Sequence, residues 1–301
     1  MLYFPKICLG DDQMIIDIHT HTFPDKIANK AVHSLQEKCH TALFADGTEA
    51  CLHAEEENAG VDLAVVQPVA TYPQQVPSIN NHVIARFGKG SIPPKGLLSF
   101  AAMHQAYPEW EAELDRIVSA GIPGIKIHPP YTEVDMDDPR TIRILKRCRD
   151  LDLIVLIHSG WDVGLPGRAE ALPQKIRSAL DAVGPMKLIA GHMAGWQCWK
   201  EAARLLSGTG IWLDTAVSLG RLTPAGDGHE WKEEDLQTLT DDGFCEMVQA
   251  FGADRVLFGT DSPWADPAAE LNKIRSMPLS KADIDAICGG NAARLLGLAA
   301  E

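Results

Sequence analysis

The 301-residue sequence has no long apolar run, no excess of basic residues and no low-complexity tract. Its apolar runs, such as residues 153–157, are far shorter than the roughly 20 residues of a transmembrane helix. The 27 Lys and Arg are outnumbered by 41 Asp and Glu, which gives a formal net charge of −14 and a pI near 5.2. Because an acidic surface repels nucleic acid and anionic membranes, we expect neither as a partner.

Cysteine is scarce, and no two cysteines have the Cys-x-x-Cys spacing. Their odd number and scattered positions indicate free, mostly buried thiols instead of disulfides or a cysteine-based metal site. Residues 1–13 contain one Lys and a broken apolar segment without a secretory-signal pattern, so we expect a cytoplasmic protein. We interpret them as an N-terminal extension, with Met14 as an alternative start. The cysteines are Cys8, Cys39, Cys51, Cys148, Cys198, Cys245 and Cys288.

Short apolar segments alternate with amphipathic segments along the chain, without a linker or a change of composition. This alternation is typical of α/β proteins in which helices cover a parallel sheet. Eight such units, and no glycine-rich phosphate-binding fingerprint after any strand, favour a single-domain (β/α)8 TIM barrel over residues 14–301. Strands are expected at 14–21, 61–69, 95–104, 124–129, 151–160, 187–192, 211–216 and 255–264. Helices are expected at 48–59, 78–87, 108–120, 139–150, 172–183, 196–207, 236–251, 267–275 and 280–298.

The first expected strand, MIIDIHTH at residues 14–21, contains polar side chains spaced two apart. Alternate residues of a strand share a face, so Asp17, His19 and His21 are expected to point the same way. Two neighbouring imidazoles suit a divalent metal ion, although a His-x-His pair alone is a weak motif.

Six of the 11 histidines fall at the ends of expected strands. In a TIM barrel these ends meet at one rim, where the active site lies. Imidazoles and a carboxylate favour zinc, with manganese, iron and nickel as alternatives. The polar residues at these ends are His19, His21, Gln67, His104, His128, His158, His192, Asp214 and Asp261. His104 alone is better interpreted as a residue that caps a loop.

Several of these motifs together resemble the amidohydrolase superfamily, and within it the group that includes aminocarboxymuconate-semialdehyde decarboxylase. The resemblance covers the chain from Met14 onward and includes GGNAARLLGL at residues 289–298. The motifs are His19-Thr20-His21, Lys126 in GIKIHP, His158, His192 in AGHMAG and Asp261 in FGTDSPW.

The resemblance implies one divalent metal ion, and the ligand types favour Zn²⁺, with Mn²⁺ as the alternative. It implies that the ligands are His19, His21, His158 and Asp261. Asp261 and His192 would be the catalytic residues.

Lys126 and His128 share strand parity and are predicted to bind substrate. In binuclear members of the family a lysine at this position is carboxylated and bridges two ions. We favour one ion, because GIKIHP resembles the mononuclear group, in which the lysine stays a cation and meets a substrate oxyanion or carboxylate. The remaining alternative is that Lys126 supports a neighbouring ligand.

Other substrate contacts are expected from loops that follow the strands. Trp161, with Trp196 and Trp264, would give the rim flat apolar walls or pack loops together. Arg168 would clamp a carboxylate or brace its own loop, which also contains Asp162. Asp214 would contact substrate or orient a ligand.

Two functions fit these residues. The first is a metal-dependent hydrolase that acts on a small-molecule lactone, ester or amide through activated water. The second is a non-oxidative decarboxylase of a small carboxylic acid. The chain lacks an obvious long insertion to cover an aromatic acid, which favours the hydrolase, and a barrel used only for binding is disfavoured because every ligand position is filled. The expected partner is a small-molecule substrate, and a homo-oligomer is left open.

Overall fold

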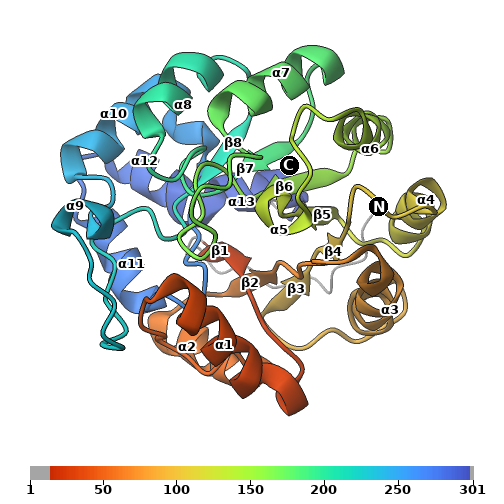
Figure 1. Ribbon diagram of the computed structural model, residues 1–301, viewed down its shortest axis with the longest axis horizontal. Helices are drawn as coiled ribbons and strands as arrows, with labels where there is room; N and C mark the ends of the chain where they lie inside the picture. The colour runs from red at the N-terminus through yellow and green to blue at the C-terminus, as the bar shows by residue number, and fades with distance from the viewer. Residues whose placement is uncertain (1–13, 299–301) are drawn as a thin grey trace.

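The computed structural model describes residues 14–298 as a parallel TIM barrel, the predicted fold class. Figure 1 shows the strands in the centre with helices around them. The strands are β1 (Ile16–Thr20), β2 (Leu63–Val66), β3 (Leu97–Ser99), β4 (Ala101–Ala102), β5 (Gly124–Ile127), β6 (Ile154–Ile157), β7 (Leu188–Ala190), β8 (Trp212–Asp214) and β9 (Val256–Leu257).

Backbone hydrogen bonds join these nine strands into a barrel of eight strand positions, here called staves, because β3 and β4 together form one of them. Strands β1 to β3 and β4 to β9 form two ladders in which all pairs are parallel. Only Phe100 separates β3 from β4, and its N–H still donates to the carbonyl of Val66 at 3.0 Å. On the other side the N–H of Ile18 donates to the carbonyl of Phe258 at 3.0 Å, and Thr20 pairs with Ser262. The first and last staves therefore lie side by side.

Most helices lie where the sequence predicts them, and α6 and α11 have the predicted bounds. The helices α1, α5 and α9 were not predicted. The helices are α1 (Asp25–Cys39), α2 (Glu49–Ala59), α3 (Val76–Phe87), α4 (Trp110–Ser119), α5 (Pro129–Thr132), α6 (Pro139–Asp150), α7 (Pro173–Val183), α8 (Trp199–Leu206), α9 (Glu233–Leu236), α10 (Asp241–Phe251), α11 (Pro267–Arg275), α12 (Lys281–Asp285) and α13 (Asn291–Leu296). Short 3₁₀ turns are η1 (Pro73–Gln75) and η2 (Ala253–Arg255).

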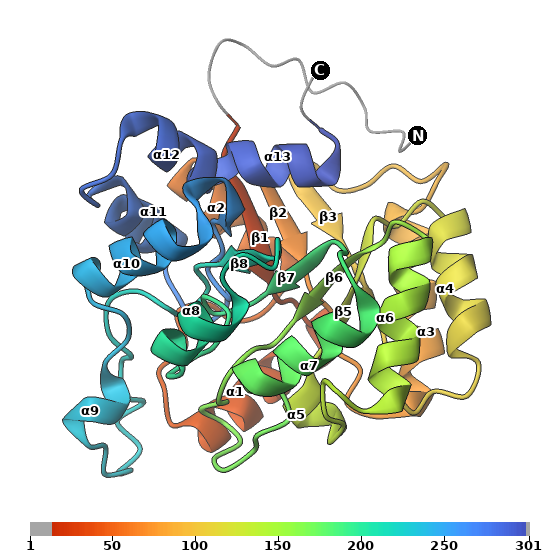
Figure 2. The same ribbon diagram turned by 90° about the horizontal axis from the view of Figure 1, so that it is seen from above.

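The predicted helix 280–298 is divided by a π-helical turn, η3 (Ala286–Gly290), between α12 and α13. A Cβ atom at Gly289 would lie 1.9 Å from the carbonyl oxygen of Met14, so only glycine allows this turn to approach the start of β1. The side-chain amide of Asn291 donates to the carbonyls of Ala253 and Val256 at 2.8 and 2.7 Å. The GGNAARLLGL segment therefore closes the amino-terminal end of the barrel, opposite α1 and α5 (Figure 2).

Buried aliphatic and aromatic side chains fill the barrel interior, among them Ile16, Ile18, Leu63, Val65, Phe100, Leu156 and Ile189. The six cysteines within residues 14–298 are free, as predicted, and three of them are buried; Cys8 and the predicted extension 1–13 lie outside the described residues. In the described part of the chain, no helix has the length and apolar character needed to cross a membrane.

Asp17 does not share a face with the two histidines, so that part of the prediction is wrong. The pairing of β1 with β2 shifts between Asp17 and Thr20, which breaks the simple alternation of side chains. The Asp17 carboxyl interacts with Glu56 of α2 and Glu270 of α11, two helices that pack against each other. Burial raises the pKa of Glu56, and the nearby Asp17 raises it further; burial also raises the pKa of Glu270 to about 8.

Glu56→Gln is expected to stabilise the protein at pH 8 and to have little effect at pH 4. The side chain of Glu56 is 3% exposed, and its raised pKa means that the folded state favours the protonated acid. The contribution of Glu56 to the free energy of unfolding is therefore fully present below about pH 4.3, the pKa of Glu in the unfolded chain. This contribution is lost as the pH rises. Urea unfolding at the two pH values should show a gain of about 1 kcal/mol or more at pH 8. The exposed neighbour on the same helix, Glu57→Gln, is the control, and an equal change in both variants would contradict the prediction.

Candidate metal centre and cavity

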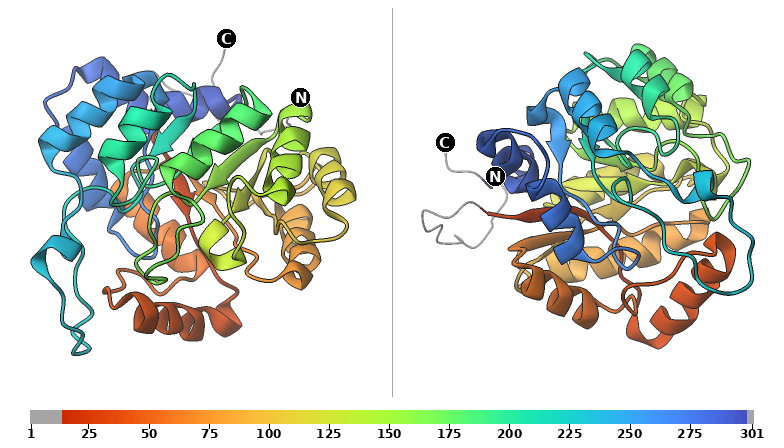
Figure 3. Two further views of the ribbon diagram at one scale, coloured as in Figure 1. Left: turned by 45° about the horizontal axis from the view of Figure 1, so that its top comes forward. Right: turned by 90° about the vertical axis from the view of Figure 1, so that its left-hand side faces the viewer.

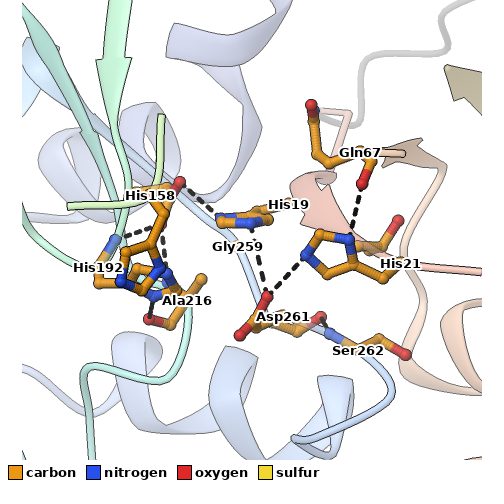
Figure 4. A network of polar contacts seen from close by, with 12 residues as sticks. His19, His21, Gln67, His158, His192, Ala216, Gly259, Asp261 and Ser262 are labelled. Atoms are coloured by element: carbon orange, nitrogen blue, oxygen red, sulfur yellow. Dashed lines mark hydrogen bonds and ion pairs between the residues drawn. The ribbon is translucent and has the colours of Figure 1, made fainter. Parts of the chain in front are cut away.

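His19, His21 and Asp261 come together at the carboxyl-terminal rim of the barrel (Figure 4). His19 lies in β1, His21 directly follows it, and Asp261 lies in the loop after β9. Asp261 Oδ1 lies 3.0 Å from His21 Nε2 and 3.5 Å from His19 Nε2. The backbone N–H of Asp261 donates to the carbonyl of His19 at 2.8 Å, which ties this loop to β1.

The hydrogen bonds of these histidines show that the group suits a cation. His21 Nδ1 lies 2.7 Å from the carbonyl oxygen of Gln67, which only accepts, so Nδ1 carries the hydrogen. His19 Nδ1 lies 2.9 Å from the Asp214 carboxylate and carries its hydrogen for the same reason. With Nδ1 occupied in each ring, the Nε2 atoms of both rings face the Asp261 carboxylate. Acceptors that converge in this way, with each ring oriented through its other nitrogen, are typical of a divalent metal site.

His19 does not take up a second proton, so its Nε2 atom cannot become a donor to the Asp261 carboxylate. The ring is fully buried, and burial, with the nearby Lys126 ammonium as a second cause, lowers the pKa of His19 to about 4. His19 therefore stays neutral at physiological pH and remains an acceptor.

Lys126 on β5 places an ammonium against the same group. Its Nζ lies 2.7 Å from His19 Nε2, and the residue is 1% exposed. Burial lowers the pKa of Lys126 to about 8, although the carboxylates of Asp261, Asp214 and Asp162 oppose the change. Lys126 thus touches a predicted ligand, and it also lines the cavity where substrate would bind.

Asp214 at the end of β8 orients two of the predicted site residues. One carboxylate oxygen bonds His19, and the other accepts from the backbone N–H groups of His192 and Ala216 at 2.9 and 3.2 Å. Burial alone would raise the pKa of Asp214, but its contacts with His19 and His192 lower it to about 2. Of the two roles expected for Asp214, these hydrogen bonds are those that the orienting role requires.

His158 joins a second group, with His128 and Asp162. Asp162 Oδ2 lies 3.4 Å from His128 Nε2 and 3.8 Å from His158 Nε2, and the two rings stack with centroids 4.4 Å apart. His158 Nε2 also lies 3.1 Å from the carbonyl oxygen of Trp161. His158 therefore belongs to this second group of side chains, and its role as a fourth ligand stays a prediction. Burial raises the pKa of Asp162 to about 6.

His192 stands between the two groups, with its ring centroid 4.6 Å from that of His158 and 5.2 Å from that of His19. Its Nδ1 donates to the carbonyl of Ala216 at 2.9 Å, which leaves Nε2 as the acceptor. His192 and Asp261 both have left-handed backbones, with φ of +55° and +62°. Such strain costs about 1–3 kcal/mol per residue and is common at functional sites.

One cavity of about 1320 Å³ opens over both groups. Of the predicted substrate-binding residues, Lys126, His128 and Trp161 line it, together with Trp196 and Trp264.

Arg168 does not reach this cavity. Its guanidinium pairs with Glu133 at 2.5 Å and with Glu170 at 3.4 Å, so it braces its own loop, the alternative that the sequence left open. The interpretation of His104 as a loop cap is confirmed, since its Nδ1 accepts from the N–H of Ala106 at 3.1 Å.

Two contributions were not predicted from the sequence: the backbone carbonyl of Gln67, which orients His21, and the carboxylate of Asp162 beside His128 and His158. A backbone carbonyl leaves no sequence signal. The position of Asp162, four residues after His158, was the signal available for the second.

A family model described as amidohydrolase matches residues 16–298. This chain belongs to the amidohydrolase family. A search of curated proteins finds no match.

Solved structures share this TIM-barrel fold at low identity. An uncharacterised TIM-barrel protein from Bordetella bronchiseptica has a TM-score of 0.69 and 17% identity, over 95% of this chain and 99% of that chain. A dihydroxybenzoic acid decarboxylase from Polaromonas sp. JS666, with bound manganese and 2-nitroresorcinol, has a TM-score of 0.65 and 14% identity, over 95% and 98%. A putative 2-pyrone-4,6-dicarboxylic acid hydrolase from Pseudomonas putida has a TM-score of 0.63 and 15% identity, over 96% and 100%.

Asp214→Asn is expected to weaken metal binding by about 10–100-fold, because the amide no longer fixes the His19 tautomer as a carboxylate does. Competition with a chromophoric chelator measures the affinity for Zn²⁺ and Mn²⁺. Asp152→Asn, which removes an exposed ion pair with Lys187, is the control and should leave the affinity unchanged. An Asp214→Asn protein that folds, by circular dichroism, and binds metal as tightly as the wild type would rule out the orienting role.

Proposed function

We propose that this amidohydrolase is a metal-dependent hydrolase of a small-molecule lactone, ester or amide. The observation that carries the proposal is the convergence of the His19, His21 and Asp261 acceptors beside the Lys126 ammonium. These three residues, with His158 as the predicted fourth ligand, would hold one divalent ion, with zinc favoured over manganese.

When bound, such an ion supplies Lewis acidity and brings the pKa of water toward neutrality. Asp261 then accepts the proton of the attacking water through its carboxylate, whose pKa is held well below the usual range by His19 and His21 against the effect of burial. The Lys126 ammonium pairs with the oxyanion that develops on the substrate carbonyl. His192, which lines the cavity, receives the proton of the attacking water at Nε2 and passes it to the leaving group.

The second candidate is a non-oxidative decarboxylase, and a specific observation favours it. The same Lys126 ammonium suits a substrate carboxylate, and one of the similar structures is a manganese-bound dihydroxybenzoic acid decarboxylase. In this reaction Asp261 would deliver a proton to the carbon that loses CO₂. The same residues serve both reactions, so the product distinguishes them.

The test is a product assay on the purified full-length chain after elemental analysis. A panel of lactones, esters, amides and hydroxy-aromatic acids is assayed with separate detection of titratable acid, of free amine and of CO₂. We expect one metal ion per chain, release of acid from a lactone or ester or of free amine from an amide, and no CO₂. Release of CO₂ without net acid would contradict the hydrolase and support the decarboxylase. Two metal ions per chain with a carboxylated Lys126 would contradict the single-ion site.

Asp261→Asn is expected to lower kcat by about 10²–10⁴-fold, because the amide cannot accept the proton. Since an amide oxygen remains a possible ligand, metal content should fall much less than kcat. The two measurements on one preparation, elemental analysis and kcat, check this difference. Asp266→Asn, which changes a carboxylate that caps α11 nearby, is the control. Parallel losses of metal and of kcat would show that Asp261 acts as a ligand only.

A further inference from the structure

Apolar side chains that are exposed to solvent line the cavity. Among residues 14–298, the large apolar side chains that are exposed are Ile27, Phe44, Tyr72 and Ile92. Ile27 on α1, 51% exposed, and Phe44, 42% exposed, both line the cavity. Exposed apolar surface at the mouth of a concave site is typical of a binding surface.

Apolar side chains continue from this mouth along the walls. They come from α1, α3 and the segment after β8, which surround the polar floor formed by the two histidine groups. The walls and the floor belong to one cavity, so a molecule that extends outward from the floor meets the walls. The wall residues include Leu35 of α1, Ile79 and Phe87 of α3, and Leu219 and Leu222 after β8.

Two of the charged residues on these walls, Arg86 and Arg221, are paired with carboxylates. The guanidinium of Arg86 makes two bonds of 2.6 Å to the Glu49 carboxylate, and Arg221 pairs with Glu233 at 2.8 Å. The buried ammonium of Lys126 instead lies at the floor. The walls are thus less polar than the floor, although Asp25 and Lys26 of α1 also line the cavity.

The wall formed by α1 is fixed in place. Its carboxyl-terminal end is bound to residues 223–225 by backbone hydrogen bonds from Ala42 to Thr223 at 2.7 Å and from Ala225 to His40 at 2.9 Å. Figure 3 shows α1, in red, and the segment that carries α9, in cyan, at the same end of the barrel. An apolar wall that is already braced binds an apolar group without an added ordering cost.

We infer that the substrate carries an extended apolar group, an alkyl chain or linked rings, attached to the bond that is broken. The group lies along the chamber formed by Ile27, Phe44 and the apolar residues of α1, α3 and the segment 219–222. The inference rests on the proposed function for the reacting end. The cavity volume of about 1320 Å³ exceeds the range of about 300–1,000 Å³ that is typical of drug-sized ligands, so a compact acid or lactone leaves most of it unfilled.

The test separates binding of the apolar group from turnover. Calorimetry measures the Kd of the full-length protein for butyrate, hexanoate, octanoate and decanoate, both metal-loaded and after chelation. Burial of each methylene is expected to lower Kd by about fourfold. In parallel, kcat/KM for γ-lactones from six to twelve carbons should rise by a similar factor per methylene.

Substitutions of residues that line the cavity, and of one that does not, test which side chains form the chamber. Ile27→Ser and Phe44→Ser should weaken decanoate binding by about five- to tenfold and change butyrate binding by less than about twofold. Ile92→Ser is the control, since Ile92 is 96% exposed and lies outside the residues that line the cavity.

A Kd that does not change along the series would contradict the inference that the chamber binds an apolar group of the substrate. An equal effect of all three variants would contradict it as well. If Kd falls along the series as expected but no lactone, ester or amide is turned over, the proposed hydrolase function is wrong. The inference that the chamber binds an apolar group would still be supported.

Discussion

The site depends on the hydrogen bond between the buried Asp214 carboxylate and His19. It assigns the hydrogen of the imidazole to Nδ1 and leaves Nε2 as an acceptor that faces Asp261. The Gln67 carbonyl does the same for His21. Without these two partners each ring would be free to rotate or to change tautomer, and the acceptors would not converge. The floor of the cavity is therefore prepared before any ion binds.

The barrel supplies the rigidity that this arrangement requires. His192 and Asp261 have left-handed backbones that would relax in an isolated loop. Their N–H groups instead bond Asp214 at the end of β8 and the His19 carbonyl at the end of β1. Strain at the rim is thus balanced by hydrogen bonds to neighbouring staves, and Gly289 allows the closing helices to seal the opposite end.

Chemistry and specificity come from different parts of the chain. The groups proposed to react lie on or directly after the strands, where their positions are fixed. The apolar walls come from α1, α3 and the segment after β8, which lie outside the staves. This division allows the chamber to differ among barrels that keep the same floor, because connecting segments tolerate change better than strands do.

The sequence by itself determined the fold class and the polar residues at the rim, because short apolar strands and strand-end histidines are local signals. Local periodicity could not show that the register of β1 shifts, and so it placed Asp17 on the wrong face. It also could not predict α1, which forms a wall of the cavity. Only the tertiary structure decided that Asp214 orients His19, that Arg168 pairs with Glu133, and that His158 lies with His128 and Asp162. Such choices depend on contacts between residues far apart in the chain, and no pattern within one segment encodes them.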